Sequence, residues 1–237
     1  MLPMEGHPSR ARRLVRAIVY AVAVAVPIGI LAYLVRSSFD PLIDLDERVI
    51  VAATDFTRAH AGVQTAAEVW ELISQPWVMY AFVGVPVCVF AWVRLGLRTR
   101  AAWALATMAT GWLIALGLKA LVQRARPVIE EPFATHAGFS FPSGHATNNA
   151  IVVTILFLLL RPVLGATARR VLLGAGALWV LITCVDRLLL GAHFLSDVIA
   201  GVLLGCGLCV ASYAGYVGWS PPNPTKEPTD DDAHQMA

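Results

Sequence analysis

Six long runs without charged residues dominate the sequence and restrict what the chain can fold into. A helix needs about 20 apolar residues to cross the hydrocarbon core of a bilayer, and somewhat fewer when protein covers its ends. The runs occupy residues 17–35, 77–93, 101–118, 146–160, 171–185 and 194–218, and only Asp197 interrupts the last of them. They predict an all-α, polytopic membrane helical bundle with six transmembrane helices, of which the fourth and fifth are tilted or partly shielded.

The composition supports this class and excludes several others. Hydrophobic residues make up 57% of the chain and charged residues only 14%, whereas charged residues average about a quarter of soluble domains. Disordered, collagen-like and coiled-coil chains are excluded by the same values. The net charge of +2 is too small to favour nucleic acid as a partner. The four cysteines lie inside the apolar runs and are expected to be packing residues.

The basic residues predict the orientation of the bundle, because Lys and Arg are retained on the cytoplasmic side of a membrane. With the N-terminus inside, most of the 18 basic residues fall on the cytoplasmic side. The basic segment 1–16 and the polar, proline-rich, disordered tail 219–237 are then both cytoplasmic, and residues 17–218 form the six-span domain. A cleaved signal peptide over 17–35 is disfavoured, because the apolar core is long and no small-x-small cleavage pattern follows it.

The first outer loop, residues 36–75, is long for a connection without structure. Its stretches LDERVIVAATDF and TAAEVWELI place apolar residues at helical spacing between charged ones. They predict a short amphipathic helical segment at the outer membrane surface. Either it covers the bundle, or it forms a wall of a groove through which lipid enters.

Three clusters of polar residues lie at the outer ends of the predicted spans. They are KALVQRARP, FSFPSGHATNN and DRLLLGAHFLSD, and their candidate residues are Lys119, Arg126, Ser143, Gly144, His145, Arg187, His193 and Asp197. Taken singly, the basic residues could be interfacial anchors and the histidines could cap or pack against helices. Arg124 and His136 lie in the same outer segment and are expected to be loop residues.

Asp197 is the hardest of these residues to explain by packing, because a carboxylate inside a hydrophobic span is costly unless it is paired. His193 lies four residues earlier, so on a helix the carboxylate can hold one imidazole nitrogen and leave the other free as a nucleophile or base. Fixed cations nearby, with a turn that leads into a helix N-terminus at PSGH, suit a dense oxyanion. Phosphate fits this site best.

The three clusters together resemble the signature of the type 2 phosphatidic acid phosphatase family. KALVQRARP corresponds to its Lys-x6-Arg-Pro element, PSGH is unaltered, and DRLLLGAHFLSD corresponds to its Ser-Arg-x5-His-x3-Asp element. The signature spans residues 119–197, and the resemblance covers about 101–218. One signature position departs, since Asp186 stands where the family has serine. Asp186 is expected either to point away from the site or to orient Arg187 through a charge-assisted contact.

The resemblance implies a mechanism without a metal or other cofactor. His193 would attack phosphorus and form a phosphohistidine, and Asp197 would orient it. His145 would protonate the leaving group and then activate water. The phosphoryl oxygens would be bound by Lys119, Arg126, Arg187 and the backbone N–H groups around Ser143 and Gly144.

The function expected from the sequence is that of an integral membrane lipid phosphatase. Its active site would lie on the extracytoplasmic side of the cell membrane, and both termini would lie in the cytoplasm. The substrate would be the phosphate monoester or diphosphate of a lipid, such as undecaprenyl or decaprenyl diphosphate, phosphatidic acid or phosphatidylglycerophosphate. Besides this lipid and the bilayer, the sequence indicates no partner and no oligomeric state. A catalytically silent protein that binds or moves lipid, and a lipid phosphotransferase, are the alternatives on the same scaffold.

Overall fold

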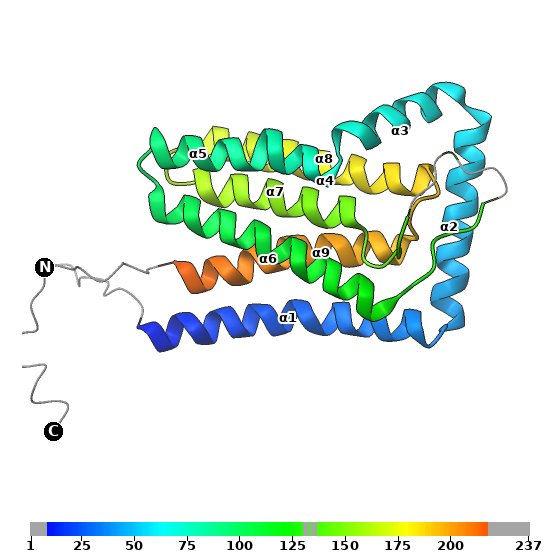
Figure 1. The fold of residues 1–237 in the computed structure, drawn as a ribbon, viewed down its shortest axis with the longest axis horizontal. Coiled ribbons are helices and arrows are strands. Elements are labelled where there is room, and N and C mark those ends of the chain that lie inside the picture. The colour runs from blue at the N-terminus through cyan, green and yellow to red at the C-terminus, as the bar shows by residue number, and fades with distance from the viewer. Residues whose placement is uncertain (1–8, 130–132, 134–136, 218–237) are drawn as a thin grey trace, which may run out of the picture.

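The fold was obtained as a computed structural model, which describes residues 9–129, 133 and 137–217. All regular elements among these residues are helical (Figure 1). In chain order they are α1 (Arg10–Arg36), α2 (Asp40–Ala59), α3 (Ala61–Ile73), α4 (Pro76–Met79), the π-helix η1 (Tyr80–Gly84), α5 (Val85–Val93), α6 (Arg98–Val122), α7 (Gly144–Leu160), α8 (Ala166–Leu189) and α9 (Leu195–Tyr216). The predicted tail 219–237 and residues 1–8 of the basic segment lie outside the described residues.

Local sequence signals explain where several helices begin and end. The hydroxyl of Ser9 accepts a hydrogen bond from the backbone N–H of Arg12 and caps the start of α1. Prolines occupy the first turns of α2 and α4, where no backbone N–H is needed. Helix α6 ends at Val122. The next residue, Gln123, has a left-handed φ of 53°, and the chain leaves the helix axis there.

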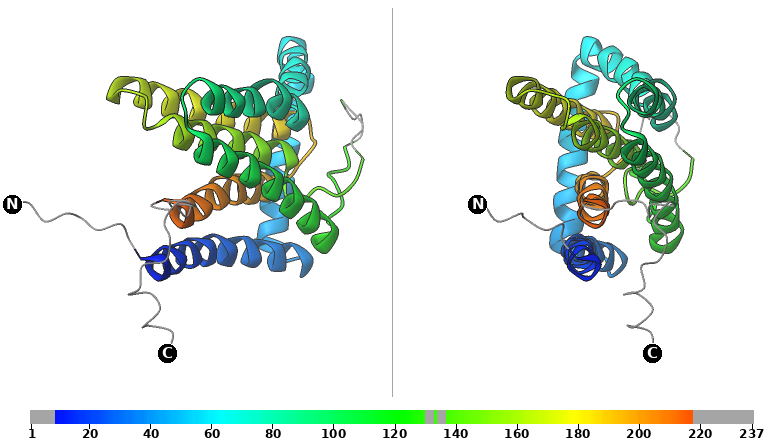
Figure 2. Two further views of the ribbon diagram at one scale, coloured as in Figure 1. Left: turned by 60° about the vertical axis from the view of Figure 1, so that its left-hand side comes forward. Right: turned by 90° about the vertical axis from the view of Figure 1, so that its left-hand side faces the viewer.

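The long helices run side by side, and α2 crosses one end of them (Figures 1 and 2). The start of α1 and the end of α9 both lie at the opposite end of the bundle. The largest buried core is formed by residues of α5, α6, α7 and α9, and it contains Cys88, Met108, Ile155, Leu159 and Cys209. The two cysteines of this core are free thiols, as expected for packing residues.

Five of the described helical segments are long and apolar enough to cross a membrane. They are Arg10–Arg36, Pro76–Val93, Arg98–Val122, Ala166–Leu189 and Leu195–Tyr216. Helix α7 covers the predicted fourth span, but it has 17 residues, and most of its side chains are buried among the neighbouring helices. A sixth span over α7 therefore stays a prediction, and the burial of this short helix agrees with the expected partial shielding of the fourth span.

The first outer loop is helical over most of its length, as α2 and α3. The buried face of α2 is unexpectedly polar, since Asp46, Thr54 and Thr57 are all fully or almost fully buried. The hydroxyl of Thr57 donates to the carbonyl oxygen of Leu189, 2.9 Å away at the end of α8. Helix α2 is thus attached to the bundle by polar contacts, and its position at a membrane surface stays a prediction.

Small residues let α9 pack closely against α7. A Cβ at Gly201 would lie 2.9 Å from the carbonyl oxygen of Ser143, and one at Gly205 would lie 2.5 Å from that of Thr147. A side chain at either glycine would therefore push the two helices apart. This contact joins the start of α9 to the start of α7, where the candidate site lies.

Candidate active site

The three sequence clusters meet at the end of the bundle that α2 crosses. The first two are joined by the connection between α6 and α7, and the third lies in the turn between α8 and α9. Within that connection the chain runs back along itself: the backbone N–H of Ser140 donates to the carbonyl oxygen of Arg124 at 2.9 Å, and its hydroxyl donates to that of Ala125 at 2.9 Å. This pairing places the residues after α6 beside those before α7.

His193 is held by the turn that ends α8. Gly191 adopts a positive φ of 63°, which a residue with a side chain rarely tolerates. The backbone N–H groups of Ala192 and His193 then both donate to the carbonyl oxygen of Arg187, at 3.0 and 3.3 Å. Arg187 thus positions the candidate nucleophile through its backbone.

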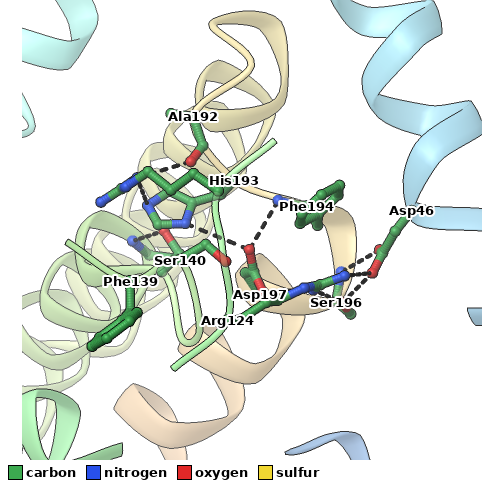
Figure 3. A network of polar contacts seen from close by, with 12 residues as sticks. Asp46, Arg124, Phe139, Ser140, Ala192, His193, Phe194, Ser196 and Asp197 are labelled. Carbon is green, nitrogen blue, oxygen red and sulfur yellow. Dashed lines mark hydrogen bonds and ion pairs between the residues drawn. The ribbon is translucent and has the colours of Figure 1, made fainter. Parts of the chain in front are cut away.

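The imidazole of His193 is buried, and each of its nitrogens faces a different charged group (Figure 3). Nε2 lies 3.3 Å from Nη1 of Arg126, and Nδ1 lies 3.7 Å from Oδ2 of Asp197. Because a guanidinium can only donate, Nε2 accepts and carries the lone pair. The proton of the neutral ring is therefore on Nδ1, facing the carboxylate of Asp197.

Burial lowers the pKa of His193 to about 4, and the positive charges of Arg126 and Lys119 act in the same direction. The carboxylate of Asp197 opposes this shift without overcoming it. The ring is consequently neutral at physiological pH, so its Nε2 lone pair is available for attack on an electrophile.

Arg126 lies on the Nε2 side of His193, and both it and Lys119 bind backbone carbonyl groups. Nζ of Lys119 donates to the carbonyl oxygen of Phe139 at 2.6 Å. The Arg126 guanidinium donates to the carbonyl oxygens of Gly138 at 3.1 Å and Ala192 at 2.9 Å. Burial lowers the pKa of Arg126, but a guanidinium stays charged at neutral pH. These two cations can exchange their carbonyl partners for the oxygens of an anion.

The start of α7 adjoins these cations. The hydroxyl of Ser143 accepts from the backbone N–H of Ala146, and the backbone N–H of Ser143 donates to the carbonyl oxygen of Asp197 at 3.0 Å. Ser143 thus joins α7 to α9, and binding of phosphate by its N–H would require that contact to be replaced, so this role stays a prediction. Gly144 is better placed, since a Cβ there would lie 3.9 Å from Cε of Lys119. His145 is half-buried in the first turn of α7.

Arg187 is fully buried near the end of α8, and two carboxylates bind its guanidinium. Nε and Nη2 both donate to Oδ2 of Asp186, and Nη1 donates to Oε1 of Glu71 at 2.9 Å. Of the two hypotheses for Asp186, this geometry supports the orienting contact. Direct binding of phosphate by Arg187 would require a phosphoryl oxygen to replace Glu71, so that role stays a prediction.

Arg124 and Asp46 lie at the candidate site, although the sequence did not predict a role for either residue there. Arg124 was expected to be a loop residue, but it is buried and bridges Asp46 of α2 to Ser196 and Asp197 of α9 (Figure 3). Asp46 lies on the same helical face as Ile50 and Thr54, and an acidic residue on the inward face of α2 was the available signal. His136 lies outside the described residues. Among those described, no group of three or more His, Cys, Asp or Glu side chains could hold a metal ion.

Comparison with known proteins identifies the family of the chain. The sequence profile of the PAP2 superfamily matches residues 100–220, which is more than half of the chain and includes all three clusters. The chain belongs to the PAP2 superfamily. The resemblance inferred from the motifs is thereby confirmed.

Two curated relatives illustrate the range of the PAP2 superfamily. Phosphatidylglycerophosphatase B of Bacillus subtilis is 32% identical over 174 residues, which are 66% of this chain and 84% of that protein. Lipid A 1-phosphatase of Rhizobium etli is 38% identical over 113 residues, which are 44% of this chain and 45% of that protein. Both relatives are phosphatases, which confirms the expected enzyme class: a hydrolase that acts on phosphoric esters.

A solved PAP2 structure has the same fold. The crystal structure of a transmembrane PAP2 type phosphatidylglycerolphosphate phosphatase from Bacillus subtilis superimposes with a TM-score of 0.68 and 21% sequence identity, and the match covers 85% of this chain and 98% of that one. Together with the five long apolar helices, this neighbour identifies the PAP2 protein described here as a multi-span membrane protein.

Proposed function

We propose that this protein removes phosphate from a lipid at the outer leaflet of the cell membrane, through a phosphohistidine on His193. The observation that carries the proposal is the environment of His193. Its Nε2 lone pair faces Arg126, and its Nδ1 faces the carboxylate of Asp197. A neutral, oriented imidazole beside fixed cations is suited to attack a phosphoryl group.

In the first step, Nε2 of His193 forms a bond to phosphorus while the bond from phosphorus to the leaving oxygen breaks. Arg126 releases Nε2 and, with Lys119, binds the phosphoryl oxygens, together with the backbone N–H at Gly144. His145 gives a proton to the leaving oxygen, and Asp197 stabilises the positive charge on His193. The products of this step are the dephosphorylated lipid and the phosphohistidine.

In the second step, His145 takes a proton from water, whose oxygen attacks phosphorus. The bond between phosphorus and Nε2 breaks, inorganic phosphate leaves, and His193 returns to the neutral state. A diphosphate substrate follows the same path, with the lipid monophosphate as the leaving group. No step uses a metal, because the cationic side chains bind the phosphoryl oxygens.

The proposed substrate is a phosphate monoester of a phospholipid, with phosphatidylglycerophosphate first. The relative named phosphatidylglycerophosphatase B matches 66% of this chain, whereas lipid A 1-phosphatase matches 44% of it. Polyprenyl diphosphate is the second candidate, because the signature residues contact only the phosphoryl group and are compatible with either lipid.

The test is phosphate release by the purified full chain from phosphatidylglycerophosphate, phosphatidic acid and undecaprenyl diphosphate, each with and without EDTA. We expect the highest kcat/KM with phosphatidylglycerophosphate and no effect of EDTA. A preference for undecaprenyl diphosphate would reverse the order of substrates, and inhibition by EDTA that added metal reverses would contradict the mechanism.

The proposed intermediate has its own test. We expect wild-type protein to form an acid-labile phosphoenzyme within the first turnover and His193→Asn to form none, with phosphate release reduced at least about 10³-fold. A folded His193→Asn variant that keeps activity would exclude His193 as the nucleophile. Release of phosphate from lipid without an added acceptor distinguishes hydrolysis from a phosphotransferase or a silent lipid-binding protein.

A further inference from the structure

We propose that Asp46 and Arg124 are positioning residues for the Asp197–His193 pair, and that they tie the outer helix α2 to the reaction. This inference rests on the proposed function and adds to it two residues that lie outside the family signature. It also assigns to α2 a role beyond covering the bundle.

Both oxygens of the Asp197 carboxylate are held by hydrogen bonds (Figure 3). Nη1 of Arg124 donates to its Oδ1 at 2.7 Å, and the backbone N–H of Phe194 donates to its Oδ2 at 3.0 Å. With each oxygen held from a different direction, the plane of the carboxylate cannot rotate freely. The orientation of Oδ2 toward Nδ1 of His193, 3.7 Å away, therefore depends on Arg124.

The guanidinium of Arg124 is itself held in position by Asp46 and Phe194. Nη2 donates to Oδ2 of Asp46 at 2.7 Å, and the guanidinium lies 4.0 Å from the ring centroid of Phe194. Asp46 in turn accepts from the backbone N–H of Ser196 at 2.9 Å, in the first turn of α9. Arg124 is thus fixed by partners on both sides, and a shift of Asp46 would move it relative to Asp197.

Arg124 and Arg126 contact opposite sides of the His193–Asp197 pair. Nη1 of Arg126 contacts Nε2 of His193, where the phosphoryl group would be attacked. Both Nη groups of Arg124 are occupied by carboxylates, and its contact with the pair is on the Nδ1 side. Arg124 therefore acts on the reaction through Asp197 rather than by binding phosphate.

Burial makes this bridge sensitive to charge. Asp46 and Asp197 are fully buried and Arg124 nearly so, and removing one member of a buried ion pair leaves its partner's charge uncompensated. Deleting Arg124 alone would leave two buried carboxylates, so the informative variants are isosteric or balanced in charge. Asp46→Asn keeps the size of the side chain and leaves Arg124 paired with Asp197, and Arg124→Lys keeps the positive charge but offers a single nitrogen to the two carboxylates.

The experiment compares these variants with wild type and with Asp55→Asn, the same substitution at an exposed position of α2 whose ion pair with Arg58 is at the surface. Phosphate release from the phospholipid, the rate of phosphoenzyme formation, and competitive inhibition by inorganic phosphate are measured on the purified full chain. We expect Asp46→Asn to lower kcat and the rate of phosphoenzyme formation about 10- to 100-fold. KM and the inhibition constant of phosphate should stay within about twofold, and Asp55→Asn should match wild type.

Arg124→Lys keeps the test decisive if Asp46→Asn does not fold. It should fold, because a buried cation is kept, and it should still show the reduced kcat, because one ammonium cannot hold Asp46 and Asp197 in the geometry of the guanidinium. Wild-type kcat in either variant would overturn the inference. A rise in the inhibition constant of phosphate in proportion to the loss of kcat would also overturn it, because Arg124 would then be a phosphate ligand. Absence of phosphate release from wild type would instead overturn the proposed function.

Discussion

At the scale of single residues, burial decides what the charged groups of the site do. His193 is buried next to two cations, and burial together with these charges lowers its pKa, whereas Arg187 is buried between two carboxylates that bind its guanidinium. The same feature, an ionisable group at the end of an apolar helix, therefore has different partners at the two positions.

The lowered pKa of His193 predicts a dependence of stability on pH. In the unfolded chain the pKa of a histidine is about 6.5, and in the folded protein that of His193 is about 4. Between these values the unfolded state binds more protons, so this contribution to stability is complete above pH 6.5 and is lost as pH falls toward 4. At pH 5 the loss amounts to about 2 kcal/mol.

The measurement is the thermal unfolding midpoint in detergent at pH 7.5 and pH 5, for wild type and His193→Asn. Wild type should lose more stability on acidification than the variant, because asparagine does not titrate. An equal loss in both proteins would show that the pKa of His193 is not lowered in the folded state.

Asp186 provides a second prediction at this scale. Asp186→Ser restores the residue of the family signature but removes one of the two carboxylates that bind Arg187. We expect a lower unfolding midpoint and phosphatase activity within about tenfold of wild type, because Glu71 still orients the guanidinium. A gain in activity of more than tenfold would indicate that Asp186 opposes the anionic substrate.

At the scale of elements, the site depends on how closely the starts of α7 and α9 approach each other. The backbone N–H of Ser143 donates to the carbonyl oxygen of Asp197, and Gly201 and Gly205 keep the two helices in contact just below. The glycine spacing of GVLLGCGL therefore serves packing within the chain, and it sets the distance between the second and third sequence clusters.

This contact predicts opposite effects of the same substitution at two glycines. Gly205→Ala places a Cβ 2.5 Å from the carbonyl oxygen of Thr147, so the helices must separate, at a cost of about 1–3 kcal/mol. Gly174→Ala in α8 places a Cβ in open space, and it should leave stability unchanged or raise it by up to about 1 kcal/mol. Unfolding midpoints and phosphate release measure both effects, and equal midpoints for the two variants would contradict the close packing of α7 and α9.

At the scale of the whole molecule, the two ends of the bundle differ in charge and in chemistry. The connections from α5 to α6 and from α7 to α8 lie at the end where α1 begins. They carry Arg94 and Arg161, and the start of α8 adds Arg169 and Arg170. The candidate site lies at the other end, under α2. By the positive-inside rule this arrangement predicts a site that faces outward.

A pair of matched cysteine variants tests the orientation. Val128 is 98% exposed beside the site and Val163 is 49% exposed at the opposite end. In intact cells a membrane-impermeant thiol reagent should label Val128→Cys, and it should label Val163→Cys only after the membrane is opened. Labelling of the parent chain gives the background from its own cysteines. The reverse pattern would place the site in the cytoplasm.

Some parts of this protein could be predicted from the sequence because they depend on local spacing. The length of the apolar runs indicates a helical membrane protein, which needs only helix geometry and the polarity of the bilayer. Spacing also predicted that Lys119 and Arg126, and likewise His193 and Asp197, share one helical face. In the structure Arg126 lies beyond the end of α6 and His193 lies before the start of α9, so the connections between helices, and not one helix, bring these side chains together.

Only the tertiary structure decided which of the other charges belong to the site. Arg124 was expected to be an ordinary loop residue, but its guanidinium lies 2.7 Å from Asp46, 78 positions away, and the guanidinium of Arg187 lies 2.9 Å from Glu71, 116 positions away. Neither pairing follows from local spacing. The physical reason is the same in each case: burial and long-range pairing depend on how helices pack, and no local pattern in the chain encodes that packing.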